Sequence, residues 1–306
     1  AQRFHRDHTV SARSVDNDVE GRGMACDELL SLEALLVSRA YLYTLFHKVF
    51  GGEPDERLLK LVAASTTEDV LDEYAEECEV LAKLKGFVSV LGQRLSDGHF
   101  IAEIRDEYTR FFQGPADLPA LPWESAHIGN ERMVFQASTL AVREAYCAQG
   151  LRLKLCGRMP DDHVSVMCAF MGILAKRALK AFRTRNYEVF RRLMLAQYSF
   201  ACQHMTNWLP EYSLHALRVQ KAFLYPQFAQ GVAAFVEVDE VFCTHAIRWV
   251  DDAVSVAEYA EAHYSSERYF GEAEAAMSER SALVLRGIEE NELTVIGERS
   301  SRERSL

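Results

Sequence analysis

Apolar side chains recur at helical spacing along most of the chain. The first clear run follows Asp27, where leucine and aromatic residues three or four positions apart form one face of a helix. Members of this face are Leu29, Leu32, Leu36, Tyr43, Phe46 and Phe50. Asp27 is a suitable N-cap, and Gly51-Gly52 followed by Pro54 is a strong stop signal. The pattern predicts a long first helix that ends at residue 51.

The same periodicity predicts further helices. They are a short helix over 55–64, a long helix opened by a Thr66–Asp69 capping box and continued to Leu91, a helix over 101–111, one over 131–148, one after Pro160, one capped by Asn186 and ended by Pro210, and one opened by Ser213 and bent near Pro226. An all-β fold needs a turn about every 8 to 12 residues. Only 7 prolines and 16 glycines serve the whole chain, and no strand alternation stands out. The sequence therefore predicts an all-α fold.

The pattern also divides the chain. Residues 1–24 have almost no apolar periodicity and are predicted to be a disordered arm or leader. Residues 25–248 are predicted to form one helical-bundle domain. Residues 249–306 shift in composition toward Ala, Glu, Ser and Arg, which predicts a helical extension and a frayed tail.

Charge narrows the possible partners. The chain has 34 basic and 45 acidic residues, a net charge of −11. This balance argues against a nucleic-acid partner, because phosphate binding needs a positive face. Residues 53–79 carry ten acidic residues against Arg57 and Lys60, a local net charge of −8, whereas residues 176–192 are basic. The two stretches are interpreted as solvated helix faces that pair within the fold, or the acidic one as a surface that attracts a basic peptide.

The cysteines and the N-terminus indicate a compartment. Seven cysteines are scattered without a CxxC pair, which is typical of buried thiols in a reducing environment rather than of a metal cluster. Residues 1–23 lack the apolar core of a signal peptide. The longest stretch free of charged residues, 193–210, contains polar side chains, so no membrane insertion is predicted. A cytoplasmic protein is expected.

Signatures of catalysis are missing from the sequence. It contains no phosphate-binding, dinucleotide-binding, GxSxG or HExxH motif, so no catalytic residue, no cofactor and no metal is predicted. His5 and His8 are interpreted as a chance pair, Asp251-Asp252 as a solvated helix face, and His204 beside Trp208 as a core histidine with its packed indole. His163 is interpreted as part of a capping cluster at a helix start.

A proline-rich segment interrupts the helices at residues 113–130. Pro115, Pro119 and Pro122 fall within eight positions, which predicts an extended loop. A loop of this length in a helical domain is usually functional.

This loop carries a resemblance to a known family. Residues 107–115 read EYTRFFQGP, residues 118–125 read LPALPWES, and residues 159–163 read MPDDH. These segments, with residues 131–144 and Phe200, His204, Trp208 and Pro210, resemble in order and spacing the TorD/DmsD/NarJ group of redox-enzyme maturation chaperones. The similarity extends over roughly residues 30–245. Two positions depart from the family pattern: Met159 replaces a usual glutamate, which weakens any role in nucleotide binding, and Phe111 replaces a usual leucine.

The resemblance implies a TorD-like, all-helical cytoplasmic chaperone that is not an enzyme. Its expected partner is the apo catalytic subunit of a molybdenum-dependent oxidoreductase of the dimethyl sulfoxide reductase type, bound through an N-terminal segment that is often a twin-arginine signal peptide. Assistance in cofactor insertion, proofreading of export and a homodimeric state are also implied. The expected peptide-binding residues are Tyr108, Phe112, Gly114, Pro115, Pro122, Trp123, Ser125, Asp161, Asp162 and His163. In this set the aromatic residues supply contact area and the carboxylates face an arginine guanidinium.

Two other classes of function remain open from the residues alone. One is a helical scaffold or regulatory protein that binds a different partner. The other is a metal- or nucleotide-dependent hydrolase, which the missing motifs disfavour.

Overall fold

The computed structural model describes residues 18–114, 117–128, 137–153, 159–263 and 296–298. Its elements, in chain order, are α1 (Asp18–Gly51), α2 (Glu56–Val62), α3 (Ser65–Ala75), α4 (Glu79–Arg94), α5 (Phe100–Tyr108), the π-helical turn η2 (Thr109–Gln113), α6 (Ser125–Ile128), α7 (Ala137–Ala148), β1 (Leu151–Leu153), α8 (Val164–Arg183), α9 (Tyr187–His204), α10 (Leu209–Leu217), α11 (Tyr225–His263) and β2 (Ile296–Glu298). The prediction of an all-α domain is confirmed.

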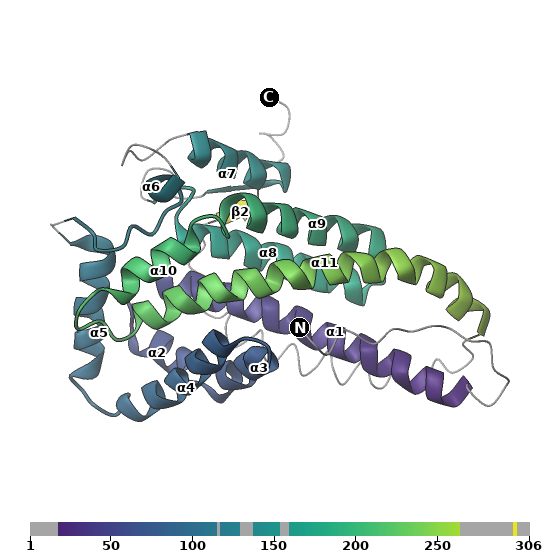
Figure 1. Cartoon of the computed structure of the whole chain (residues 1–306), viewed down its shortest axis with the longest axis horizontal. Coiled ribbons are helices and arrows are strands. Elements are labelled where there is room, and N and C mark those ends of the chain that lie inside the picture. The colour runs from purple at the N-terminus through teal and green to yellow at the C-terminus, as the bar shows by residue number, and fades with distance from the viewer. Residues whose placement is uncertain (1–17, 115–116, 129–136, 154–158, 264–295, 299–306) are drawn as a thin grey trace.

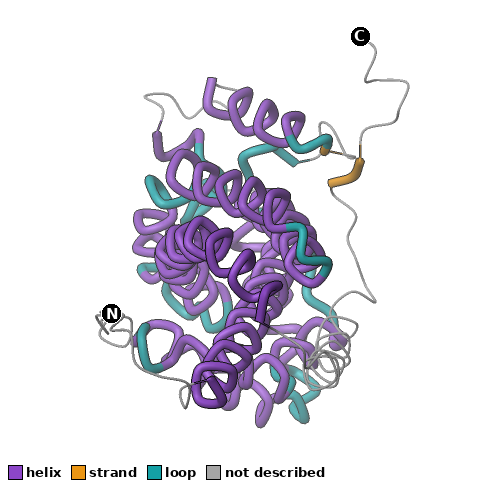
Figure 2. Tube along the Cα trace, turned by 90° about the vertical axis from the view of Figure 1, so that its right-hand side faces the viewer, coloured by secondary structure: helices purple, strands orange, loops and turns teal. Residues whose placement is uncertain are grey.

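Four long helices form the centre of the domain. The α1 helix packs along α8, α8 packs on α9, and α9 packs on α11 (Figure 1). The shorter α3 and α4 pack against one another on one side of this layer, whereas α6 and α7 lie on the other side. Figure 2 looks nearly along the long helices and shows them gathered into one bundle, with α7 at its edge. The core is built from the apolar faces of α1, α8, α9 and α11 together with α3, α4, α5 and α10.

Two three-residue strands were not predicted. Leu151–Leu153 pairs antiparallel with Ile296–Glu298, with Arg152 opposite Gly297. Alternation over three residues is too short to stand out from a helical pattern. The pair ties a segment near the C-terminus to the end of α7.

Several helix boundaries differ from the prediction. The first helix ends at Gly51 as expected but begins at Asp18, inside the segment assigned to the arm; residues 1–17 lie outside the described residues. The expected helix from Thr66 to Leu91 is two helices, broken at the extended residue Cys78, because the break lets both apolar faces meet the core. The capping box is absent: Ala64 holds the N-cap position of α3.

The region around Pro210 also differs. Pro210 lies in the first turn of α10 rather than at the end of α9, where a proline costs no hydrogen bond. Ser213 is inside α10, and Pro226 is the second residue of α11, where it does not bend the helix. Asn186 caps α9 as predicted, since its side chain accepts a hydrogen bond from the Val189 amide.

A buried ion pair lies between α1, α9 and α11. The guanidinium of Arg39 donates to both carboxylate oxygens of Asp239 and, at 3.0 Å, to Oε1 of Gln197. The Tyr43 hydroxyl donates to Asp239 at 2.7 Å. Burial, the largest single influence, would lower the pKa of Arg39, but the charge and hydrogen bond of Asp239 together with the nearby Cys243 and Tyr43 raise that pKa above the ordinary value. The sequence pattern of apolar faces gave no sign of this charged centre.

The charged stretches pair with other elements. From the basic stretch, Arg183 binds Glu33 of α1 and Arg191 binds Asp251 of α11. In the acidic stretch, Asp72 binds Lys85 and Glu79 binds Lys83. Asp251 thus has a partner on the helix surface, in agreement with its interpretation as part of a solvated face. None of the described helices is long and apolar enough to cross a membrane.

Candidate functional site

The proline-rich loop is fastened to the segment that precedes α8. Trp123 and His163 form an isolated antiparallel bridge. The amide of Glu124 donates to the carbonyl of Asp162 at 3.1 Å, and the amide of Val164 donates to the carbonyl of Pro122 at 2.8 Å. Two motifs about forty positions apart are therefore joined through their backbones.

Two carboxylates of the MPDDH segment bind within the chain. One oxygen of Asp162 accepts the Ser125 amide at 2.8 Å, at the start of α6, whereas its Oδ1 is buried with no hydrogen-bond partner. Asp161 forms a bidentate ion pair with Arg143 of α7. Nε of Arg143 donates to Oδ1 at 3.2 Å and Nη2 donates to Oδ2 at 2.7 Å. The Tyr146 hydroxyl donates to the Asp161 carbonyl at 2.8 Å. The acids predicted to face an arginine thus hold α6 and α7 against the start of α8.

His163 is the N-cap of α8, which confirms its interpretation as a capping residue. Its Nδ1 accepts a hydrogen bond from the Ser165 amide at 3.1 Å. Burial, with a smaller contribution from the nearby His47, lowers the pKa of His163 to about 3. The ring is therefore neutral at physiological pH.

Aromatic rings surround the other end of the loop. Phe112 lies 5.1 Å from Tyr108, 5.0 Å from Tyr225 and 6.2 Å from His163, measured between ring centroids. These contacts join η2 to the start of α11 and to the N-cap of α8. These ring contacts therefore fix the position of the Phe112 side chain on η2.

Glu107, the first residue of the EYTRFFQGP motif, anchors the start of α11. Its carboxylate accepts the amides of Phe223, Leu224 and Tyr225 at 2.6, 2.9 and 2.8 Å. Burial raises the pKa of Glu107, against the effect of these backbone donors. The carboxylate thus accepts hydrogen bonds from backbone amides at the start of α11 that have no partner within the helix.

We expect Glu107→Gln to lower the free energy of unfolding by about 1–2 kcal/mol, because one amide hydrogen would face a backbone donor in place of an acceptor. Urea denaturation followed by circular dichroism measures this change. The matched control is Glu103→Gln on the exposed face of the same helix, where Glu103 pairs with Arg94 at the surface. Equal stability losses in the two variants would contradict the anchoring role.

A buried Glu124–His204 pair was missed as a site feature. His204 Nδ1 lies 3.2 Å from each carboxylate oxygen of Glu124. Burial raises the pKa of Glu124, whereas hydrogen bonding to His204 opposes the shift. Trp208 Nε1 donates to the His204 carbonyl at 2.7 Å, so the core interpretation of these two residues is confirmed. The sequence feature that could have indicated this pair is Glu124 itself, a charged residue next to Trp123 in an otherwise apolar segment.

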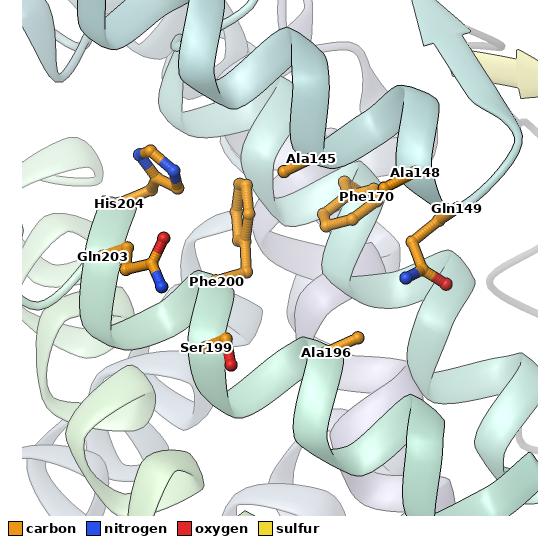
Figure 3. A pocket seen from close by; sticks show the side chains of 9 residues that line it. All are labelled: Ala145, Ala148, Gln149, Phe170, Ala196, Ser199, Phe200, Gln203 and His204. Carbon is orange, nitrogen blue, oxygen red and sulfur yellow. The ribbon is translucent and has the colours of Figure 1, made fainter.

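A pocket of about 150 Å³ opens beside this pair, between α7 and α9. Figure 3 shows Phe200 of α9 next to Ala145 of α7, with Phe170 of α8 farther along the pocket and His204 at its opposite end. Phe170 is buried beneath the opening. The other side chains that line the pocket are Ala148, Gln149, Ala196, Ser199 and Gln203. The pocket offers an apolar floor with a few polar groups at its rim.

The predicted site residues differ in accessibility. Phe112, Gly114 and Trp123 are partly exposed. Those that are buried are Tyr108, Pro122, Ser125, Asp161, Asp162 and His163. Pro115 lies outside the described residues. The structure thus brings the two motifs together, with most of their polar groups already bonded inside the domain.

Comparison with known proteins agrees with this architecture. The family model "Nitrate reductase delta subunit" matches residues 71–213. A chaperone protein TorD from Vibrio cholerae is 22% identical over 209 residues, which cover 68% of this chain and 93% of that protein. A Tat proofreading chaperone DmsD from Salmonella typhi is 26% identical over 152 residues, 50% of this chain and 64% of that protein. No solved structure matches the chain.

The relatives that share this helical region are named as chaperones. Among these proteins, the chain is similar to the TorD/DmsD/NarJ group of redox-enzyme maturation chaperones. The resemblance seen in the sequence is therefore confirmed.

Proposed function

We propose that this chaperone binds the N-terminal segment of the apo catalytic subunit of a molybdenum-dependent oxidoreductase of the dimethyl sulfoxide reductase type. It acts in the cytoplasm, assists cofactor insertion and proofreads export of a client that carries a twin-arginine peptide. The observation that carries the proposal is the bridge between Trp123 and His163. This bridge presents a partly exposed indole from a loop that is fixed before the peptide arrives.

The proposed peptide-binding residues have two kinds of role. Phe112, Gly114 and Trp123 are partly exposed and supply the contact surface. Asp161, Asp162 and His163, with Tyr108, Pro122 and Ser125, are buried and hold that surface in place. A fixed surface lowers the ordering cost of binding, and flat aromatic side chains give large contact area at low entropic cost.

The pocket between α7 and α9 gives the peptide a second anchor in this proposal. A cavity of about 150 Å³ accepts a benzene ring in another protein, so a pocket of this volume fits one leucine or phenylalanine side chain. The pair Glu124–His204 links the pocket to the loop, because Glu124 follows Trp123 and His204 lines the pocket. Signal segments contain apolar residues after their arginines. Such a segment could contact the loop at Trp123 and place an apolar side chain in the pocket.

The acidic stretch, residues 53–79, is proposed to act on the encounter with the peptide rather than on the bound complex. Figure 1 places α3, which carries much of that stretch, on the opposite side of the central helices from α6 and α7. Its carboxylates therefore do not contact a peptide bound at the loop. They raise the rate of encounter with a basic segment through the field around the protein.

A synthetic peptide tests the proposal directly. The peptide copies the N-terminus of a molybdoenzyme catalytic subunit from the same organism, and calorimetry with the full chain measures its binding. We expect a dissociation constant of about 1 μM or tighter, and weaker binding when the two arginines are replaced by glutamine. Absence of binding for every such subunit of the organism would overturn the proposal.

We expect Trp123→Ala to weaken peptide binding by at least about tenfold, as for a central aromatic contact. The matched control is Trp249→Ala, which removes a partly buried indole packed on Phe182 and Tyr187 at the other end of the bundle. Circular dichroism checks that both variants fold. Unchanged affinity in Trp123→Ala would place the peptide away from the loop.

A further inference from the structure

Three potential metal ligands converge where α6 meets α10. His127 of α6 has its Nδ1 3.9 Å from Oε2 of Glu211, and His215 has its Nε2 3.9 Å from Oε1 of the same carboxylate. The three ligand atoms all lie within 4.8 Å of one another. Glu211 and His215 are four residues apart on α10 and therefore share one face. No motif in the sequence indicates this group, because His127 comes from a segment distant from α10.

The orientation of His127 is fixed by the proline loop. Its Nε2 lies 2.8 Å from the carbonyl oxygen of Leu121. A carbonyl only accepts, so Nε2 carries the hydrogen, and in the neutral ring Nδ1 presents a lone pair. The ring also stacks on Trp208, with centroids 5.3 Å apart and planes 28° apart. The imidazole is thus held by a hydrogen bond and by a packed indole.

This orientation directs a lone pair at a carboxylate. Nδ1 of neutral His127 and both oxygens of Glu211 are acceptors, and a bound cation between them would satisfy these facing acceptors. A backbone carbonyl on the far nitrogen is the usual outer partner of a metal-binding histidine, where it fixes the tautomer. The arrangement therefore has both the ligands and the support of a metal site.

The donor set selects the metal. Two imidazoles and one carboxylate suit Zn²⁺, which binds nitrogen and oxygen at about 2.0–2.1 Å in a tetrahedral arrangement. Such bonds place ligand atoms about 3.3 Å apart, so the three ligand atoms, which lie within 4.8 Å of one another, need to move together by at most about 1.5 Å. The side chains of Glu211 and His215 are 59% and 38% exposed and are free to turn, whereas that of His127 is 4% exposed.

We infer that His127, Glu211 and His215 form a Zn²⁺ site with one position left for water or for a ligand from a partner. The metal would join α6 to α10. Because α6 closely follows Trp123, the metal would also fix the C-terminal end of the proline-rich loop to α10. This assignment does not depend on the identity of the client.

Zinc titration of the full chain tests the inference. The protein is first stripped with a chelator and then titrated with Zn²⁺ in competition with a chromophoric chelator. We expect one site in which either His127→Gln or His215→Gln weakens binding by at least about tenfold. Replacement of Zn²⁺ by Co²⁺ should give the visible absorption of a tetrahedral centre in the wild type only. Zn²⁺ should also raise the melting temperature of the wild type but not of either variant.

Two controls separate this site from other zinc-binding groups. His99→Gln removes an exposed histidine elsewhere on the surface and should leave binding unchanged. The double variant His5→Gln/His8→Gln removes the N-terminal HxxH pair and should also leave it unchanged. His215 is partly exposed, so its replacement tests the site even where His127→Gln impairs folding. Wild-type zinc affinity in folded His215→Gln, or no zinc binding in the wild type, would overturn the inference.

Discussion

Replacing Asp239 by leucine should lower the free energy of unfolding by about 3–5 kcal/mol. The substitution leaves the Arg39 guanidinium buried and without its counter-charge, and removal of one partner from a buried ion pair has this magnitude in other proteins. Arg39 is 0% exposed, and it also donates to Gln197 on α9. The Tyr43 hydroxyl would lose its acceptor as well. Urea denaturation followed by circular dichroism measures the loss.

A double-mutant cycle shows whether the pair acts as a unit. Arg39→Met alone should cost about as much as Asp239→Leu, whereas the two together should cost clearly less than their sum, because no unpaired charge remains. Arg191→Ala is the control, since the Arg191–Asp251 pair lies at the surface and should contribute little. Additive losses in the double variant would contradict the coupling.

The sequence predicted those parts of the fold that depend on local signals. Gly51, Gly52 and Pro54 end the first helix, and the Asn186 side chain caps α9, because each acts within one turn of its own position. The break at Cys78 depends on how α3 and α4 pack together, and no residue there forbids a helix. Local propensity therefore did not reveal it.

The site was predictable as a set of segments but not as a set of contacts. The resemblance brought together the proline loop and the MPDDH segment, and the Trp123–His163 bridge joins them. The burial of Asp161 and Asp162 was missed, because a carboxylate that caps a helix and one that meets a ligand look alike in a sequence. Arg143 lies on α7, and only the folded chain places it on Asp161.

His163 gives the second large expected effect, a loss of stability in acid. Its pKa is about 3 in the folded chain, against an ordinary value of 6.5. Between these values the unfolded chain binds a proton that the folded chain excludes, so stability is complete above about pH 6.5 and falls as the pH falls. This group alone should lower the free energy of unfolding by about 2 kcal/mol from pH 7 to pH 5. Urea denaturation at a series of pH values measures the slope.

His163→Asn isolates this contribution, because asparagine is a good N-cap and its oxygen can accept the Ser165 amide in place of Nδ1. The variant should lose most of the slope between pH 7 and pH 5, while any cost of the smaller side chain is the same at each pH. Glu107 and Glu124 have pKa values raised by burial and act in the opposite direction, but they are present in both proteins and cancel in the comparison. The exposed His99→Asn controls for replacement of a histidine as such. If the free energy of unfolding of His163→Asn depended on pH as strongly as that of the wild type, the buried His163 ring would not be the source of the acid sensitivity.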